Sequence, residues 1–497
     1  MSEIGKRLAE PPASEIRESL YRPLLESSDD DDFHAMLTLN KAHLVMLSEC
    51  GFVDAEIART LASGLLQIEA QGRATGPVDT QVEDPYFAFE MRLGDVIGSH
   101  AAGFLHVARS RNDIGATLDR MRARLYADRI LDVLYAVREQ CLVRADLFAD
   151  VVMPGYTHLQ PAQPITFGYL LSAYEASFAR DSARIAAAQG RADESSLGVA
   201  ALAGSGFAID RKRTAELLGF GAVTSNGLDT VGSRDFVTEL MYGVTQLGVT
   251  WSRLAQDFHT YVSDEFSSIG FPDRVAGISS IMPQKKNPVA LEFLRAQSAR
   301  TIGALTGSLS AVRSTHFSVA LDAVREGLVD AWSLMKTIPS TLQLVRLVVE
   351  TATPQADRLM LRCDANFSTA TDLADRLVQT RGLSFRDAHH VVGRVVRMAL
   401  DENKTAREVD AAMVNAAALE VLGSPLDVDD AFVSASLDAL ASVARRTTEG
   451  GTAPDTVRRA LQDARARLVR DREVHAMARE HVRESQARLA LAIEKLR

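Results

Sequence analysis

The chain has few cysteines, few aromatic side chains and no long apolar run. Its 497 residues include three cysteines, Cys50, Cys141 and Cys363, whose wide spacing matches neither a metal-binding motif nor a disulfide framework. No segment approaches the roughly 18 consecutive apolar residues of a membrane span. The first residues, MSEIGKRLAEPPASEI, lack the apolar core of a secretory signal. We therefore expect a cytoplasmic protein that does not span a membrane.

An excess of positive charge is also absent. Lysine and arginine number 55 against 65 aspartate and glutamate residues, which gives a formal net charge of -10, and no basic stripe stands out. Proteins that bind nucleic acids usually carry such a stripe, because phosphate contacts dominate their affinity. The composition predicts a small-molecule partner and no nucleic acid. The acidic run at 27–32 (SSDDDD) is interpreted as a solvated turn.

What the chain does contain is long helical periodicity. From Phe236 to Phe258 apolar residues recur in steps of three and four, which keeps one face of a helix apolar over the whole stretch. Similar stretches follow Asn112, Ile165 and Pro288. Prolines number only 15 and strand-type alternation is scarce, so the sequence predicts an all-α fold with a bundle of long helices.

One segment concentrates residues suited to anion chemistry. Residues 277–288 read GISSIMPQKKNP and hold two serines, two lysines and an asparagine. Lys285 and Lys286 supply positive charge, and Asn287 before a proline is typical of a helix N-cap, whose free amides attract anions. Taken alone, the Asn-Pro pair also fits a purely structural cap. The whole string is similar to GSSxMPxKxN, the mobile-loop motif of the fumarase/aspartase superfamily, with Ile278 in place of the first glycine.

Further segments narrow the resemblance to the argininosuccinate lyase family. Three of these segments also fit a structural interpretation. In 105–113, Ser110 and Asp113 have capping-box spacing; the histidine of 154–164 suits a buried core position; and the arginine and aspartate of 226–236 suit an ion pair. Together the segments identify the chain as a member of that family. They are LHVARSRND at 105–113, PGYTHLQPAQP at 154–164, NGLDTVGSRDF at 226–236, AIDR at 208–211 and FRDAHH at 385–390.

The resemblance implies an all-α subunit of three domains. We expect an N-terminal helical domain at 1–110, a central long-helix bundle at 111–360 and a C-terminal helical domain at 361–497. The family's subunits associate as homotetramers with a twenty-helix core, so that each active site draws on three chains. The implied reaction is β-elimination from an N-substituted aspartate, which breaks a carbon–nitrogen bond and releases fumarate without a metal or another cofactor. The same chemistry in reverse adds amines to fumarate.

The resemblance also assigns roles to individual residues. Ser279 matches the general base, which needs amide or lysine partners and exclusion of water, because a free serine is too weak a base. His158 matches the active-site histidine, and Glu292 matches the carboxylate that pairs with it across subunits. The residues at substrate-binding positions, mainly for the fumarate-side carboxylates, are Ser110, Arg111, Asn112, Thr157, Lys285 and Asn287.

The sequence departs from the family where the amine half of the substrate is held. Val289 stands where an aspartate usually follows KKNP, and Phe317, Asp322 and Arg325 stand in place of a tyrosine, a glutamine and a lysine. Each lost hydrogen-bond partner typically costs about 1–3 kcal/mol, so several changes disfavour argininosuccinate. These four residues are therefore expected to contact another amine half. The sequence predicts an aminopolycarboxylate substrate such as ethylenediamine-disuccinate or iminodisuccinate.

Other functions stay open at this point. The main alternative is an argininosuccinate lyase with a divergent arginine pocket. A non-catalytic structural homologue is another, although the retention of Ser279, His158, Lys285 and Asn287 argues against it. A helical scaffold for proteins or nucleic acids would need exposed apolar or basic repeats, which we do not find in the sequence.

Overall fold

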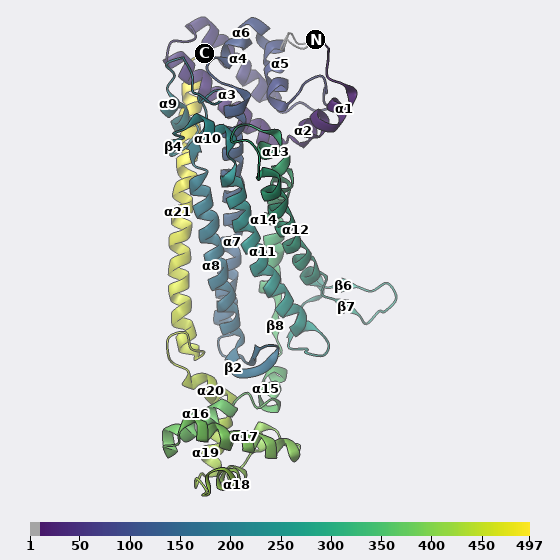
Figure 1. Cartoon of the computed structure of the whole chain (residues 1–497), viewed down its shortest axis with the longest axis vertical. Coiled ribbons are helices and arrows are strands. Elements are labelled where there is room, and N and C mark those ends of the chain that lie inside the picture. Colours follow the sequence, from purple (N-terminus) through teal and green to yellow (C-terminus); the bar gives the residue numbers. More distant parts are fainter. Residues whose placement is uncertain (1–9) are drawn as a thin grey trace.

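The computed structural model describes residues 10–497 and shows an elongated, almost entirely helical chain (Figure 1). The predicted all-α fold is confirmed, and the strands among the described residues form two-stranded ladders. No helix in this part of the chain is long and apolar enough to cross a membrane. Residues 1–9, which hold part of the segment that argues against a secretory signal, lie outside the described range.

The middle of the molecule is a bundle of long helices around one apolar core. The predicted stripe from Phe236 to Phe258 lies on α11, where its apolar side chains are buried and Trp251 is completely enclosed. Helix α11 packs against α8 and α12, and α7 packs against α8 and α14. The bundle helices are α7 (Arg111–Leu147), α8 (Phe167–Arg191), α11 (Asp235–Val262), α12 (Val289–Val312) and α14 (Val329–Thr351).

The N-terminal domain covers one end of this bundle, called the upper end below because it is uppermost in Figure 1. Its own core includes Leu44, Leu61 and Leu65, and it continues onto Ile114 at the start of α7. Its elements are α1 (Ser14–Ile16), η1 (Arg17–Tyr21), α2 (Arg22–Ser27), α3 (Asp30–Glu49), α4 (Ala55–Gln71), α5 (Pro85–Ile97), α6 (Ser99–Gly103) and η2 (Phe104–His106).

Short elements connect the bundle helices at both ends. At the upper end lie β3 (Glu194–Ser195), α9 (Arg211–Leu217), β4 (Ala222–Val223), α10 (Gly227–Gly232), α13 (Leu321–Val324) and η4 (Glu326–Leu328). Toward the lower end lie β1 (Val152–Thr157), β2 (Gln160–Thr166), β5 (Ile269–Gly270), η3 (Asp273–Val275), β6 (Gly277–Ile278), β7 (Lys286–Asn287) and β8 (Thr353–Pro354). These connections carry the predicted site residues.

The C-terminal part of the chain, expected as one helical domain at 361–497, has two different parts in the structure. A small domain with its own core spans only the first part of that range. The last helix, α21 (Pro454–Glu494), returns along the bundle, where Leu461 and Leu468 join the central core, and Leu489 reaches the N-terminal core. The small domain is built from α16 (Ala370–Arg381), α17 (Phe385–Asp401), η5 (Ala406–Glu408), α18 (Ala411–Leu422) and α19 (Asp430–Leu437), and α15 (Ala356–Ala365) and α20 (Ala439–Arg445) connect it to the bundle.

The acidic run is not the solvated turn that its composition suggests. Asp29 caps α3, and the aspartates after it form the first turn of that helix. All four pair with basic side chains of other elements: Asp29 with Lys336 at 2.6 Å, Asp30 with Arg73 at 2.9 Å, Asp31 with Arg129 at 2.6 Å and Asp32 with Arg122 at 2.6 Å. The run therefore ties α3 to α7 and α14.

Candidate active site

The first group of predicted residues lies at the upper end, where α7 begins. Ser110 is the N-cap of α7, and its hydroxyl accepts the Asn112 amide at 3.3 Å. Asp113 closes the predicted capping box by accepting the Ser110 amide at 2.8 Å. The cap prediction is confirmed, and it places Ser110, Arg111 and Asn112 together at a helix N-terminus, where the helix dipole favours an anion.

Arg111 is held by a pair of carboxylates. Its guanidinium lies 3.0 Å from Glu83 and 2.7 Å from Asp84, and it stacks over the Phe87 ring. Asp84 is at the same time the N-cap of α5, because its carboxylate accepts the Phe87 amide at 2.9 Å. Glu83 and Asp84 thus fix the direction of Arg111.

Three of the residues predicted for the amine half belong to the same end. Arg325 lies at the junction of α13 and η4 and bonds Glu326 at 2.7 Å. It lines a cavity of about 1520 Å³ together with Glu83, Arg111 and Asn112. Phe317 and Asp322 lie on the same connection between α12 and α14 and are exposed, Phe317 by 67%.

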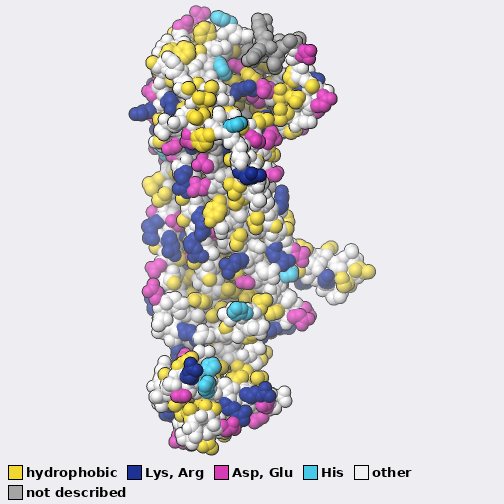
Figure 2. All heavy atoms as spheres, viewed as in Figure 1, with side chains coloured by type: hydrophobic (Ala, Val, Ile, Leu, Met, Phe, Trp, Pro, Cys, Tyr) yellow, Lys and Arg dark blue, Asp and Glu magenta, His cyan; other side chains and the backbone are white. Residues whose placement is uncertain are grey.

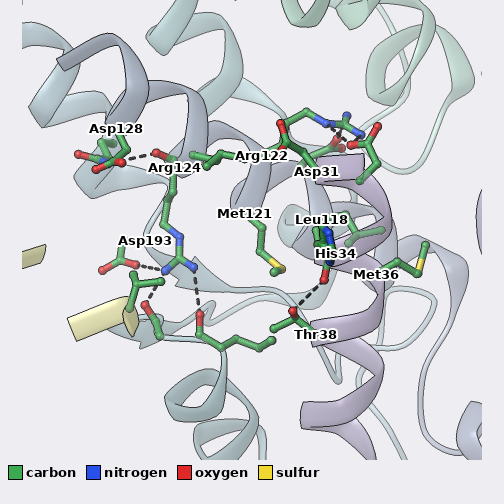
Figure 3. A pocket seen from close by; sticks show the side chains of 18 of the residues that line it. Asp31, His34, Met36, Thr38, Leu118, Met121, Arg122, Arg124, Asp128 and Asp193 are labelled. Carbon is green, nitrogen blue, oxygen red and sulfur yellow. Dashed lines mark hydrogen bonds and ion pairs between the residues drawn. The ribbon is translucent and has the colours of Figure 1, made fainter. Parts of the chain in front are cut away.

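The cavity continues along the outer face of α7 (Figure 3). Leu118 and Met121 of α7 border it there, beside α3, and Arg124 lines another part of its wall. These apolar residues belong to the stripe that follows Asn112, so one face of α7 is only partly covered by the rest of the chain.

The second group lies at the lower end, at the tip of the β1–β2 hairpin. Thr157 pairs with Gln160 across a two-residue turn formed by His158 and Leu159. Both turn residues have positive φ, 54° and 57°, a conformation that histidine adopts more often than most residues but that is strained for leucine. Thr157, His158 and Leu159 are all exposed. Strained backbone of this kind is often found at functional sites.

The third group lies on a loop that projects sideways from the bundle (Figures 1 and 2). A short ladder between β6 and β7 closes the neck of this loop. The Ser279 hydroxyl oxygen accepts the Met282 amide at 3.0 Å and the Ile281 amide at 3.4 Å. These amides are suited to stabilise a serine alkoxide, as a serine base requires. Ile278 is 92% exposed, so the loop is not docked on the rest of the chain.

The two lysines of this loop differ in their surroundings. Lys286 forms an ion pair with Asp273 at the neck, whereas Lys285 is exposed near the end of the loop. Asn287 lies in β7, and its side chain donates to the Ile278 carbonyl at 3.4 Å. The prediction that Asn287 caps the next helix is wrong: the N-cap of α12 is Pro288, and no side chain bonds to it.

The first turn of α12 carries the last two predicted residues. Val289 packs on Gly277, where a Cβ would come within 2.6 Å of the valine Cγ1. Val289 therefore contacts the neck of the Ser279 loop. Glu292 lies 3.7 Å from His259 of α11 in the same chain. Sequence patterns did not single out His259 or Asp273, because their contacts depend on the tertiary fold.

A single chain does not bring these three groups together. Ser110 precedes α7 and His158 follows it, so the 37 residues of that helix separate them by about 55 Å. The 24 residues of α12 likewise separate Val289 from Phe317 by about 36 Å. Residues 10–497 contain no cluster of three or more side chains suited to hold a metal ion.

Comparison with known proteins agrees with the segments described above. A lyase family model matches residues 24–303, and the argininosuccinate lyase C-terminal model matches residues 367–444. The chain is 36% identical over 467 residues to argininosuccinate lyase 1 of Shouchella clausii, with 94% of each chain covered. It is 34% identical to argininosuccinate lyase of Methanothermobacter thermautotrophicus, which covers 90% of this chain and 95% of the relative.

Solved structures give the same result. EDDS lyase in complex with formate superposes with a TM-score of 0.87 at 31% identity, covering 94% of this chain and 92% of the other. An EDDS lyase variant with bound fumarate also has a TM-score of 0.87, at 30% identity, covering 98% and 96%. The chain therefore belongs to the argininosuccinate lyase family of the fumarase/aspartase superfamily and is a carbon–nitrogen lyase that acts on an N-substituted aspartate.

Proposed function

We propose that the substrate is an aminopolycarboxylate, such as ethylenediamine-disuccinate or iminodisuccinate, which the enzyme cleaves reversibly to fumarate and an amine. The observation that carries this proposal is the set of residues expected at the amine half. Val289 and Phe317 offer no polar contact to a guanidinium, and Asp322 and Arg325 stand in place of the family's glutamine and lysine. Arg325, with Arg313 or His316 on the same connection, would bind an additional carboxylate. The similarity to EDDS lyase supports this choice.

In the proposed mechanism, Ser279 removes the proton next to the substrate carboxylate. The amides of Ile281 and Met282 stabilise its alkoxide, and closure of the loop excludes water. Lys285 and Asn287, which close in with the loop, stabilise the negative charge that grows on the carboxylate in the transition state.

The rest of the proposed site binds the substrate and assists departure of the amine. Ser110, Arg111, Asn112 and Thr157 bind the carboxylates of the fumarate half. His158, paired with Glu292 of another subunit, assists the leaving nitrogen. These residues do no redox chemistry, and we propose no cofactor.

We further propose that the site is assembled in a homotetramer. The three residue groups lie on separate ends and projections of one chain, and the length of α7 alone separates Ser110 from the His158 hairpin by about 55 Å. The outer face of α12 supports an assembly, because it exposes Phe293, Ile302 and Leu309 beside small residues such as Gly303 and Gly307. Light scattering coupled to size exclusion would test this, and a monomer with full activity would contradict it.

The second candidate is argininosuccinate lyase itself, which the names of the sequence relatives favour. The two are separated by incubating the enzyme and fumarate with arginine, ethylenediamine, aspartate or ammonia and identifying adducts by mass spectrometry. An adduct with a diamine or with aspartate supports the proposal. An adduct with arginine alone establishes argininosuccinate lyase. Absence of any adduct, equal to that of the Ser279→Ala variant, would favour a non-catalytic homologue.

A further inference from the structure

A completely buried carboxylate lies directly beneath the proposed carboxylate site. Asp113 has no exposed surface. One of its oxygens accepts the Ser110 amide at 2.8 Å, which completes the cap of α7. The other accepts the amides of Gly198 at 2.8 Å and Ala200 at 2.9 Å, which belong to a segment distant in sequence. A helix cap needs only the first of these contacts.

The segment that Asp113 binds is held from its other side by Arg211. This guanidinium donates to the carbonyls of Leu197 at 2.9 Å and Ser195 at 3.3 Å. Gly198 has a φ of 90°, and a Cβ there would come within 2.8 Å of the Arg211 side chain. Within the segment 195–200, the Asp113 carboxylate thus holds two amides and the Arg211 guanidinium holds two carbonyls.

The fixed segment leads directly to Asn112. The Asn112 side-chain nitrogen donates to the Ala201 carbonyl at 3.0 Å, on the exposed loop that follows the segment. A primary amide has two N–H groups, so this contact orients the side chain and leaves the second N–H for a ligand. Through Ser110 on one side and Ala200 on the other, Asp113 controls both anchors of Asn112.

We propose that Asp113 is a positioning residue, which fixes Asn112 and the loop 198–206 as one wall of the site that binds the fumarate carboxylate. This inference rests on the proposed function, in which Asn112 contacts that carboxylate. Asp113 itself does not touch the substrate. Its role is to align donors before the ligand arrives, so that binding does not have to order them.

The ionisation of Asp113 should affect this wall. Burial raises the pKa of Asp113 to about 6, against the lowering influence of its three backbone hydrogen bonds and of Arg109. Arg211 is the other charged group that faces it. A protonated carboxyl turns one oxygen into a donor and can no longer accept all three amides. Fumarate affinity should therefore weaken as the pH falls through about 6.

The test is fumarate binding to the full-length enzyme, measured by isothermal titration calorimetry at several pH values. We expect Asp113→Asn to raise the Kd for fumarate about tenfold at pH 7.5 and to remove the part of the pH dependence that belongs to Asp113. The matched control is Asp387→Asn on α17, where Ser384 and Asp387 form the same Ser-x-x-Asp pair on an exposed surface. That variant should bind fumarate as the unmodified enzyme does.

Two more variants complete the design. Asn112→Ala should raise the Kd by a similar factor, and its combination with Asp113→Asn should add little, because both act through one contact. Arg211→Lys loosens the same segment without altering Asp113 and should raise the Kd by a smaller factor, even if Asp113→Asn does not fold. If Asn112→Ala leaves the Kd unchanged, the proposed role of Asn112 fails. If Asn112→Ala weakens binding but Asp113→Asn and Arg211→Lys do not, the inference about Asp113 is wrong.

Discussion

The two ends of the central bundle hold their site residues in different ways. At the upper end, Arg111 and Asn112 are fixed by contacts within the chain, to Glu83 and Asp84 and to the Ala201 carbonyl. At the lower end, His158 lies on an exposed hairpin tip and Ser279 on a projecting loop. In the site that we propose, one half is therefore preorganised within each subunit, while the other half depends on assembly and on loop closure. Substitutions that loosen the upper end should therefore lower stability as well as affinity, whereas substitutions at the lower end should change catalysis with little effect on stability.

Ser279→Ala should produce the largest effect, and it should affect turnover only. Loss of the base is expected to lower kcat about 1000-fold or more. Because the side chain bonds only to amides of its own exposed loop, the Tm and the oligomeric state should not change. Fumarate release followed by absorbance, with Ser280→Ala as control, measures this. A large fall in Tm would show that the loop also supports the fold.

Arg211→Ala should show the opposite behaviour at the upper end. Its guanidinium donates to the backbone carbonyls of Ser195, Leu197 and Thr224. Its removal takes away the side-chain donor of Leu197 and Thr224, whereas the Ser195 carbonyl keeps the Thr224 amide. We expect the free energy of unfolding in urea to fall by about 3 kcal/mol. Arg213→Ala on the same helix removes only partly exposed ion pairs and should cost less than about 1 kcal/mol. Equal effects of the two variants would contradict the comparison.

Asp113 should make the stability of the upper end depend on pH. Its folded-state pKa of about 6 lies above its usual value of 3.8. The proton is therefore bound more tightly in the folded protein. The resulting stabilisation is complete below about pH 3.8 and is lost as the pH rises through about 6, a change on the order of 2–3 kcal/mol. The difference in unfolding free energy between the unmodified enzyme and Asp113→Asn, measured across this range, should follow that sign; a flat difference would contradict it.

Lys286→Ala should produce the smallest effect. The ion pair with Asp273 is exposed on both sides, so its loss should cost less than about 1 kcal/mol and change kcat less than twofold. Lys285→Ala, in contrast, removes the charge that we propose binds the substrate carboxylate, and it should raise KM about tenfold or more. Steady-state kinetics of the two variants would show whether only Lys285 reaches the substrate. Equal effects on KM would mean that both lysines do.

The helices and their caps were predictable from sequence because they depend on neighbouring residues. The apolar stripe of α11 and the cap at Ser110 both follow from spacing along the chain. The prediction that Asn287 is a cap was wrong because Asn287 instead pairs with Gly277 in the short β6–β7 ladder at the neck of the loop. The second role of Asp113 was not predictable, since it contacts an amide 85 residues away. The return of α21 along the bundle likewise depends on tertiary packing.

The connection between α12 and α14 has a consequence for how such an enzyme can evolve. Phe317 and Asp322 are exposed on this connection, whereas the residues that we expect to stabilise this end of the subunit, such as Asp113 and Arg211, lie on other elements. Mutations on an exposed connection usually cost little stability. Substitutions on this connection can therefore change which amine the proposed site accepts, while the folding of the subunit and the binding of fumarate stay the same.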